Sequence, residues 1–521
     1  MYDPTSHAQK WPDRPAIIMG GTGEELTFAE LDERSKRLAQ LFWSEGLRPG
    51  DHVAILMENN IRYLEAFWAA FRSGLYVTTV NRYLTAGEAG YIIDNCDARV
   101  LVTSIYMSDV ASAILDTTPK LQRRLMVDGT IQGYDAYEDA IADHPADALA
   151  EEPLGRTMLY SSGSTGQPKG IWRPLTGRTV QEGKATLVPV YQESYDVGPD
   201  TVYLSPAPMY HSAPLLFSTD FMALGATVVM MEKFDAEQSL ALIEKYRVTH
   251  AQFVTTMFSR MLKLPAEVRE SYDLSSLTHV IHGAAPCPIP VKQAMIDWLG
   301  PCIYEYYAGT EDNGATLIDS HEWLAHPGSV GKAAFGSTIR ICDADGRELP
   351  AGEVGRIYFE TSEAQAGFEY YGEPGKTAAA HHPDHFEWTA LGDLGRLDED
   401  GYLYLADRES FMIIAGGVNI YPQEIENVLA LHPAVQDAAV FGVPNEDLGE
   451  EVKAIVQLVD PAADSADMAT ELLAYCSENL ARFKVPRSIE FLEDFPRSPT
   501  GKLLKAPLRD QYWSDRDSRL V

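Results

Sequence analysis

The sequence predicts an α/β protein with three parts: a large N-terminal domain of helix-flanked, mostly parallel sheets, a small β-barrel-like subdomain, and a small α+β domain at the C-terminus. Three observations lead to this prediction. A chain of 521 residues is too long for one hydrophobic core. Before about Gly328, short apolar runs alternate with amphipathic helix patterns. After it, short β segments are separated by glycines and acidic turns.

The N-terminal part begins with signals for capped helices and buried strands. Thr27 and Glu30 have the spacing of a capping box, and Thr85 and Glu88 repeat it. Apolar residues between Leu31 and Phe42 then recur on one helical face. Short apolar runs predict strands at His52–Met57, Leu75–Val80 and Arg99–Thr103. Strands that alternate with helices in this way predict a parallel sheet.

Beyond residue 200, several predicted strands end in small or polar residues. The strands are expected at Thr201–Leu204, Ala226–Met231, His250–Val254, His279–Gly283 and Cys302–Tyr307, with a helix at Ser239–Tyr246. Three of them are followed by Ser205–His211, Ala284–Pro286 and Ala308–Glu311. Since open parallel sheets bind ligands where their strands end, these segments predict one shared crevice.

The C-terminal third contains two different sequence patterns, one after the other. Segments at Ser337–Cys342, Gly355–Glu360 and Tyr402–Ala406 predict a compact antiparallel unit. A self-contained pattern then follows, with helices at Gln423–Leu431 and Glu471–Leu480 and strands at Ala438–Gly442 and Val452–Val459. We therefore place a domain boundary near residue 408.

Composition excludes several classes of protein. Apolar and charged contents of 45% and 23% are ordinary for a globular protein. A net charge of −34 argues against a nucleic-acid partner. Five scattered cysteines give no zinc framework, and no basic-then-apolar signal opens the chain. The apolar run Ala213–Met231 contains Asp220 and predicts buried core, not an integral membrane segment. We expect a cytoplasmic protein.

The stretch Tyr160–Gly170 is the strongest local signal. It holds three glycines, four serine or threonine hydroxyls and Lys169. Glycines let backbone N–H groups approach a ligand, and hydroxyls and an ammonium suit phosphate. It is not a Walker A loop, because the Gly-Lys-Ser/Thr ending is missing. The stretch predicts a loop that holds nucleotide phosphates; a flexible Ser/Gly-rich linker is the alternative.

Six motifs, in order along nearly the whole chain, give the sequence a family resemblance. It resembles the adenylate-forming (AMP-binding) enzymes, and within them the acyl- and aryl-CoA synthetases. The motifs are Tyr160–Gly170, Tyr307–Glu311, Leu391–Asp393, Asp407–Arg408, Gly416–Glu426 and Pro496–Lys502. The resemblance implies that a carboxylate attacks the α-phosphorus of ATP and releases pyrophosphate, after which the thiol of coenzyme A displaces AMP from the acyl-adenylate. The partner is then a small-molecule carboxylic acid.

The resemblance also implies where the nucleotide binds. Thr310 would touch the α-phosphate and Glu311 would hold Mg²⁺, which takes only one or two carboxylates from a protein. Asp393 would accept from the ribose hydroxyls, Arg408 would donate to the ribose, and Tyr307 would stack on the adenine. The other nucleotide contacts fall on Ser161, Ser162, Gly163, Ser164, Thr165, Gly166, Lys169, Gly283, Ala284 and Ala285.

On the acid side, Lys502 would bridge the carboxylate and the α-phosphate, and His211 would lie beside the reacting carboxylate. Ala308 and Gly309 would border the acyl pocket, where Ala308 replaces the usual glycine of the family motif. An apolar pocket for a medium- or long-chain, aryl or ring-bearing acid is favoured over an acetate site. Phe253 and Phe258 are equally compatible with core positions.

The resemblance gives the domain boundary a purpose, because the small C-terminal domain of this family is mobile and rotates between the half-reactions. We expect an adenylation domain at 1–407, a hinge at 408–410 and the rotating domain at 411–521. Ser410 occupies a pivot position where the family more often has Asp or Lys. Gly416 and Gly417 would border the thiol tunnel, and Asn419 would make a phosphate-side contact.

Other functions agree less well with the sequence than the ligase does. An enzyme that loads a carrier protein is disfavoured because no carrier domain follows residue 521. A luciferase-like oxygenase would need oxygen-dependent light emission, and a nucleotide sensor would need a damaged motif. His321 and His326 are five residues apart and do not form a helical metal motif. The state of assembly is open, with a homodimer as one option.

Overall fold

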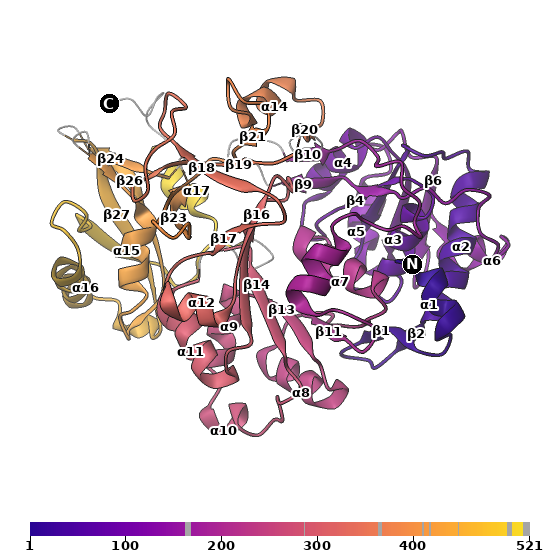
Figure 1. Cartoon of the computed structure of the whole chain (residues 1–521), viewed down its shortest axis with the longest axis horizontal. Coiled ribbons are helices and arrows are strands. Elements are labelled where there is room, and N and C mark those ends of the chain that lie inside the picture. The colour runs from indigo at the N-terminus through magenta and orange to yellow at the C-terminus, as the bar shows by residue number, and fades with distance from the viewer. Residues whose placement is uncertain are drawn as a thin grey trace.

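The computed structural model describes residues 1–161, 168–285, 287–362, 367–408, 411–415, 418–445, 448–497 and 503–513. A large part carries the N-terminus, and a smaller part formed by the last described helices and strands lies at the other side of the molecule (Figure 1). Within these ranges, no helix is long and apolar enough to cross a membrane. The α/β class predicted from the sequence is confirmed by the sheets described below.

A six-stranded sheet in which every strand is parallel to its neighbours forms the N-terminal side. Its order is β7 (Asp135–Ala136), β6 (Arg123–Val127), β5 (Ala98–Ser104), β3 (His52–Leu56), β4 (Tyr76–Thr79) and β8 (Arg156–Thr157). The central strands β3 and β4 are buried along their whole length. Continuous burial is typical of parallel strands covered on both faces. The three strands predicted here are confirmed.

A nine-stranded sheet forms the second layer. Its order is β17 (Lys332–Ala334), β16 (Ala315–Ile318), β15 (Ile303–Ala308), β14 (His279–Gly283), β13 (His250–Val254), β11 (Val202–Ser205), β12 (Thr227–Met230), β1 (Pro15–Met19) and β2 (Glu25–Thr27). From β15 to β1 all neighbours are parallel, and the pairs at both edges are antiparallel. The five strands predicted in this region all belong to this sheet.

Helices cover both sheets. They are α1 (Pro4–Lys10), α2 (Phe28–Ser44), α3 (Tyr63–Phe71), α4 (Ala86–Asn95), α5 (Ser108–Ala113), α6 (Tyr137–Ala142), α7 (Ser212–Ala223), α8 (Ala236–Tyr246), α9 (Thr255–Leu262), α10 (Ala266–Arg269), α11 (Ile289–Leu299) and α12 (Ser320–Ala325), with a short π-helix at Val188–Glu193. Helix α7 lies between the two sheets: it packs on β11 and β12, and the Trp68 indole of α3 contacts the Met222 sulfur at 3.2 Å. Its buried faces explain the apolar run predicted to be core.

Local capping explains where several helices begin. Both predicted capping boxes are present; in the first, the Glu30 N–H donates to the Thr27 hydroxyl and the Thr27 N–H donates to the Glu30 carboxylate. Helix α8 begins three residues before its predicted start because the Asp235 carboxylate accepts from the Gln238 N–H at 2.8 Å. A cap therefore sets the start of a helix more sharply than apolar periodicity does.

Antiparallel strands follow the two large sheets. A three-stranded sheet holds β20 (Glu369–Tyr370), β10 (Lys169–Trp172) and β9 (Leu159–Ser161). A five-stranded sheet holds β18 (Thr338–Cys342), β19 (Gly355–Glu360), β22 (Asp393–Leu397) and β23 (Leu403–Arg408), with β21 (Trp388–Thr389) beside β19. A short helix, α14 (Pro374–Ala380), lies between β20 and β21. The five-stranded sheet is the compact antiparallel unit that the sequence predicts.

The C-terminal part has its own sheet and core. The sheet holds β25 (Val418–Ile420), β24 (Ile413–Ala415), β27 (Gly449–Leu458) and β26 (Val435–Asn445), with β28 (Ser488–Phe491) parallel to β27. Its helices are α15 (Pro422–Leu429), α16 (Ala466–Asn479) and α17 (Lys505–Asp510). Helix α16 begins five residues before its predicted start because Ser465 caps it. Two buried apolar clusters of its own hold this part together.

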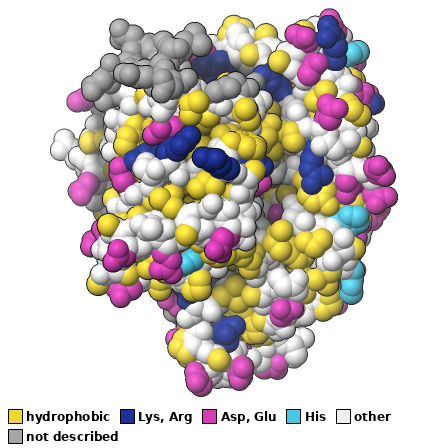
Figure 2. All heavy atoms as spheres, turned by 90° about the vertical axis from the view of Figure 1, so that its left-hand side faces the viewer, with side chains coloured by type: hydrophobic (Ala, Val, Ile, Leu, Met, Phe, Trp, Pro, Cys, Tyr) yellow, Lys and Arg dark blue, Asp and Glu magenta, His cyan; other side chains and the backbone are white. Residues whose placement is uncertain are grey.

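The face on which the C-terminal part lies differs from the acidic average of the chain. Figure 2 shows acidic side chains mostly toward its periphery, while several Lys and Arg side chains and a broad apolar area lie nearer its centre. Local positive charge on an acidic protein can direct an anionic ligand toward one face.

Candidate active site

The parallel core of the nine-stranded sheet brings the predicted site residues to one edge. Strands β11, β13, β14 and β15 are parallel neighbours, so their carboxyl ends lie together. The segments that leave these ends carry His211, Ala284, Ala285, Gly309, Thr310 and Glu311. The shared crevice predicted at the strand ends therefore has its structural basis in this register.

Gly283, the last residue of β14, has no room for a side chain. A Cβ at this position would lie 2.7 Å from the ring of Tyr306 and 2.8 Å from its carbonyl oxygen. The next residue, Ala284, has a φ of +70°, a conformation that costs a residue with a Cβ free energy. The close approach and the turn present a flat, side-chain-poor wall, which suits the planar base expected there.

Tyr307 and Asp393 meet although they are far apart in the chain. The Tyr307 hydroxyl donates to Asp393 Oδ2 at 2.7 Å. Asp393 is the first residue of β22, and Arg408, the last residue of β23, is its register partner. The structure thus brings together three residues assigned to the ribose and the base, although the Arg408 side chain is outside the described part. The expected stacking of Tyr307 on an adenine stays a prediction.

Glu311 is held through both its backbone and its side chain. Glu311 is 8% exposed, and its carboxylate accepts a hydrogen bond from the Tyr370 hydroxyl at 2.8 Å. Its carbonyl oxygen accepts from the Arg173 guanidinium at 2.5 Å, and the carbonyl of Asp312 accepts from the same group at 3.0 Å. Arg173 is 4% exposed, and burial lowers its pKa to about 10, so it remains charged at neutral pH. These bonds fix the direction in which the Glu311 carboxylate points.

Lys169 connects the glycine-rich stretch to Glu311. Strands β9 and β10 pair as an antiparallel hairpin with Ser161 opposite Lys169, so residues 162–167 form the connection between them. The Lys169 ammonium lies 4.9 Å from the centre of the Tyr370 ring, which donates to Glu311 from its hydroxyl. Ser162, Gly163, Ser164, Thr165 and Gly166 lie outside the described residues, as does the side chain of Ser161.

His211 is a neutral histidine at the start of α7. Burial lowers its pKa to about 4. Its Nε2 atom is buried and finds no hydrogen-bond partner in the described part of the chain. Neutral imidazole can offer one donor or one acceptor to a substrate, but it cannot hold a carboxylate by charge.

Asn59 holds the loop that precedes His211. Its amide nitrogen donates to the carbonyls of Ala207 at 3.0 Å and Met231 at 2.7 Å, and its carbonyl oxygen accepts from the Met209 N–H at 2.8 Å. The side chain is 6% exposed and follows β3 of the other sheet. Asn59 therefore ties the two large sheets together at the site.

Sequence reasoning missed Arg173, Tyr370 and Asn59. Arg173 lies three residues beyond the last glycine of the glycine-rich stretch, and the position of a cation near a phosphate loop was the one signal that could have identified it. Tyr370 and Asn59 lie in segments without a motif. Their partners are 59 and about 150 residues away in the chain, a separation that no local pattern encodes.

The remaining predicted residues lie as follows. Ala308 and Gly309 are at the end of β15, and a Cβ on Gly309 would lie 2.0 Å from Leu391. Asn419 is exposed on β25. Ser410, Gly416, Gly417 and Lys502 are outside the described ranges. Arg497 and Leu503, the described residues on either side of 498–502, form an antiparallel bridge. The roles predicted for these residues stay predictions.

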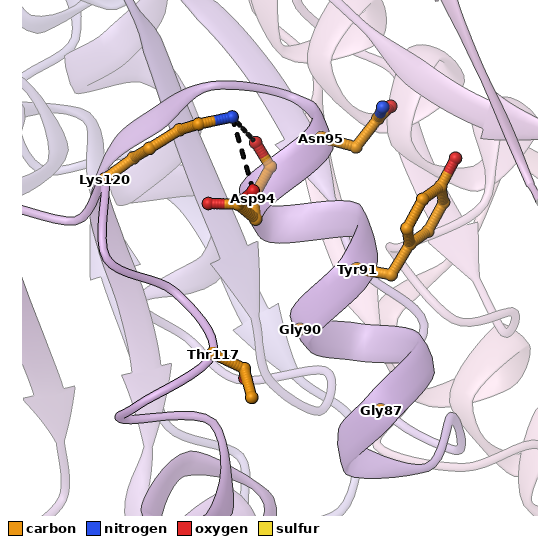
Figure 3. Close-up of a pocket in the computed structure, with 7 residues that line it drawn as sticks. All are labelled: Gly87, Gly90, Tyr91, Asp94, Asn95, Thr117 and Lys120. Carbon is orange, nitrogen blue, oxygen red and sulfur yellow. Dashed lines mark hydrogen bonds and ion pairs between the residues drawn. The ribbon is translucent and has the colours of Figure 1, made fainter.

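The histidine pair His321 and His326 and a surface pocket along α4 are separate from this site. The described residues include no group of three or more His, Cys, Asp or Glu that could hold a metal on its own, and His326 stacks on Tyr402 with ring centres 3.7 Å apart. A surface pocket of about 410 Å³ lies along α4, where Lys120 contacts Asp94 (Figure 3). Its wall residue Asn95 accepts from the Tyr160 hydroxyl, but none of the predicted site residues lines it.

Comparison with known proteins gives a consistent result over the whole chain. The profile of the family described as "AMP-binding enzyme" matches residues 5–368, and that of the "AMP-binding enzyme C-terminal domain" matches residues 424–502. A feruloyl-CoA synthase from Amycolatopsis sp is 33% identical, and 98% of each chain is covered. A fatty acid–[acyl-carrier-protein] ligase, ScoC from Streptomyces coeruleorubidus, is 31% identical over 98% of this chain and 95% of its own. The ATP-bound crystal structure of MatB from Rhodopseudomonas palustris aligns with a TM-score of 0.82 at 28% identity, covering 98% and 99% of the two chains.

Proposed function

We propose a function from one premise: this chain belongs to the AMP-binding enzyme family. It activates a carboxylic acid with ATP as an acyl-adenylate and transfers the acyl group to the thiol of coenzyme A, releasing pyrophosphate and AMP. The observation that carries this proposal is the meeting of Tyr307 with Asp393 and of Tyr370 with Glu311 at the strand ends that also carry His211. That arrangement supports a nucleoside site, a phosphate site and an acid site that lie side by side.

The first half-reaction is an in-line displacement at phosphorus, so positioning and charge stabilisation do most of the work. Lys169 and the hydroxyls of Ser161 and Thr165 hold the β- and γ-phosphates, and Thr310 donates to the α-phosphate. Lys502 neutralises the charge that gathers as the acid carboxylate approaches the α-phosphorus. His211, neutral at physiological pH, offers its buried Nε2 to the carboxylate as a hydrogen-bond partner.

Glu311 fits the expected magnesium ion. A single buried carboxylate, directed by Tyr370 and Arg173, lies at the phosphate side of the sheet edge. Magnesium commonly binds one or two protein carboxylates and completes its shell with substrate phosphates and water. When bound, the ion offsets the charge of the phosphates.

The nucleoside fits the other end of the same edge. Asp393 accepts from the ribose hydroxyls and Arg408 donates to the ribose oxygens. Gly283, Ala284 and Ala285 form the wall against which the adenine lies, and Tyr307 covers the opposite face of the base. The hydrogen bond between Tyr307 and Asp393 supports this assignment because it holds the tyrosine ring beside the carboxylate that would bind the ribose.

The second half-reaction uses the C-terminal domain. Residues 411–521 rotate about a hinge at 408–410, which withdraws Lys502 and admits the pantetheine arm past Gly416 and Gly417, with Asn419 near the phosphates. The separate sheet and core of the C-terminal part support a rotation as one body. The Lys and Arg side chains on the face in Figure 2 would attract the anionic nucleotide end of coenzyme A.

A carrier protein is a second candidate for the thiol, since the relative ScoC is named as an acyl-carrier-protein ligase. One experiment separates the two: AMP and pyrophosphate are measured with a panel of acids, with coenzyme A, with holo-acyl carrier protein, or with neither. AMP release that requires both an acid and coenzyme A supports the proposal. Turnover with the carrier protein alone would support the second candidate, and no pyrophosphate with any acid would refute both.

A further inference from the structure

A buried pair of opposite charges lies beside the turn that is proposed to receive the adenine. Lys292 of α11 donates to Glu305 Oε2 of β15 at 2.6 Å, and the two residues are 0% and 4% exposed. The Lys292 ammonium also lies 5.0 Å from the centre of the Trp323 ring. His282 Nε2 lies 3.7 Å from the same carboxylate oxygen, but burial keeps the pKa of His282 well below its usual value. Lys292 is therefore the cation that faces Glu305, and we call these two residues the buried pair.

The buried pair joins the two elements between which the turn 283–285 lies. The turn follows β14, whose His282 is the register partner of Glu305 on β15. It precedes α11, in which Lys292 is three residues beyond the first residue. The N-cap residue of α11, Pro288, provides no side-chain cap. The contact between Lys292 and Glu305 therefore holds the start of α11 against the sheet.

Ala284 shows why both ends of this turn have to be held. Its φ of +70° is a conformation that a residue with a Cβ keeps only where its surroundings enforce it. On the strand side, Gly283 is held by the pairing of β14 with β13. On the helix side, the Thr255 hydroxyl donates to the Ala285 carbonyl at 3.5 Å, which is too long to fix the turn. The buried pair supplies a shorter and charged contact on that side.

The chemistry of the buried pair favours precision over stability. Taking two charges out of water costs about as much free energy as their attraction returns, and apolar side chains of similar volume often stabilise such a position equally well. A charged hydrogen bond, however, is short and directional, so it fixes the distance between two elements more closely than apolar packing does. Precision matters beside a reacting nucleotide, because a displacement of about 1 Å can slow a reaction by about 100-fold.

We propose that Lys292 and Glu305 are positioning residues that hold the turn 283–285 in the shape that receives the base of ATP. The inference rests on the proposed function and extends it beyond the residues that line the nucleotide. Neither residue contacts ATP; both act through α11 and β15 on the turn.

The test replaces the buried pair by apolar residues of similar size. In the double variant Lys292→Met/Glu305→Met no charge is left without a partner, so we expect a thermal midpoint near that of the wild type. The KM for ATP in ATP–pyrophosphate exchange should rise by about tenfold, while the KM of the acid changes by less than about twofold. The preference for ATP over GTP in kcat/KM should fall, because a displaced turn distinguishes the two bases less well.

A rescue and a matched control accompany the double variant. Glycine adopts the φ of Ala284 without its free-energy cost, so Ala284→Gly added to the double variant should recover most of the lost ATP affinity. Arg34 and Glu65, 2.7 Å apart, form another ion pair with a fully buried carboxylate, between α2 and α3. Arg34→Met/Glu65→Met should keep the wild-type KM for ATP and the wild-type preference for ATP over GTP.

An unchanged KM for ATP and an unchanged base preference in the double variant would overturn the inference. An equal rise in the KM of ATP and of the acid would do the same, because it indicates a general loosening of the fold. If the double variant does not fold, Glu305→Gln decides, since glutamine keeps the shape and can accept from Lys292 without the charge. A wild-type KM for ATP in that variant would contradict the inference.

Calorimetric binding of ATP separates this inference from the proposed function. A wild-type protein that binds ATP but forms no AMP with any acid fails only as a ligase. The affinity for ATP then replaces the KM in the comparison, and equal affinities of the wild type and the double variant would overturn the positioning role. A wild-type protein that does not bind ATP would contradict both.

Discussion

Removing the Tyr370 hydroxyl tests whether this residue directs Glu311. The variant Tyr370→Phe keeps the ring that faces Lys169 and deletes the 2.8 Å hydrogen bond to the Glu311 carboxylate. A hydrogen bond to a charged group contributes about 1.5–3 kcal/mol. Since Glu311 is only 8% exposed, water replaces the bond poorly. At about 1.4 kcal/mol per factor of ten, adenylation should slow by about 10- to 100-fold.

The assay is ATP–pyrophosphate exchange with a saturating acid, measured over a range of magnesium concentrations. We expect the loss to be largest at low magnesium, because a misdirected carboxylate binds the ion more weakly. Thioester formation from a supplied acyl-adenylate, which needs no magnesium-bound pyrophosphate, should stay near the wild-type rate. A readout confined to the first half-reaction separates a role at Glu311 from general damage to the fold.

A matched control is available. The Tyr402 hydroxyl donates to the Glu322 carboxylate at 3.2 Å, outside the site. Tyr402→Phe should lower stability to a similar extent and leave exchange unchanged. Exchange by Tyr370→Phe within twofold of the wild type at every magnesium concentration would refute the assignment.

Four further outcomes are expected. Lys502→Ala should lose adenylation but keep thioester formation from a supplied acyl-adenylate; equal loss of both would contradict its role, as measured by the two half-reaction assays. Gly166→Ala should slow turnover more than it weakens ATP binding, and an effect seen only in ATP affinity by calorimetry would count against pyrophosphate release. Asn59→Ala removes three buried hydrogen bonds and should cost about 2–4 kcal/mol in urea unfolding and raise the KM of the acid; an unchanged KM would exclude a link to the acid site. Burial lowers the pKa of His211 from 6.5 in the unfolded chain to about 4, so its neutral form contributes stability that is complete above pH 6.5 and is lost as the pH falls toward 4. His211→Gln should therefore make the free energy of unfolding depend less on pH in this range. An unchanged pH dependence of unfolding would contradict this expectation.

Local sequence signals predicted most of the fold because they depend on neighbours in the chain. The Thr27–Glu30 and Thr85–Glu88 boxes involve residues three apart, and both are present. Alternation of strands and helices was enough to predict the parallel sheets. Phe253 and Phe258, left open between pocket and core, are core residues with 1% and 0% exposure. The spacing of apolar residues predicts that a side chain is buried, but it does not show whether that side chain lies against a ligand or against the core.

The candidate site was only partly predictable, since its support comes from distant segments. Asp393 and Glu311 belong to motifs, whereas Tyr370 stands on a two-residue strand that pairs with β10 about 200 residues earlier. Such a strand is too short for periodicity to detect.

A contact at the junction between the two parts of the chain bears on how often the C-terminal part adopts each of its two proposed orientations. Asp407, directly before the proposed hinge, accepts a hydrogen bond from the Gln423 N–H at the start of α15 at 2.9 Å. A rotation about 408–410 would separate these groups and let water take their place. One partly buried bond of this kind stabilises an orientation by only about 1–3 kcal/mol. A gap of that size corresponds to a second orientation populated at about 0.6% to 15%, so in the proposed rotation each substrate needs only to bias an equilibrium that already exists.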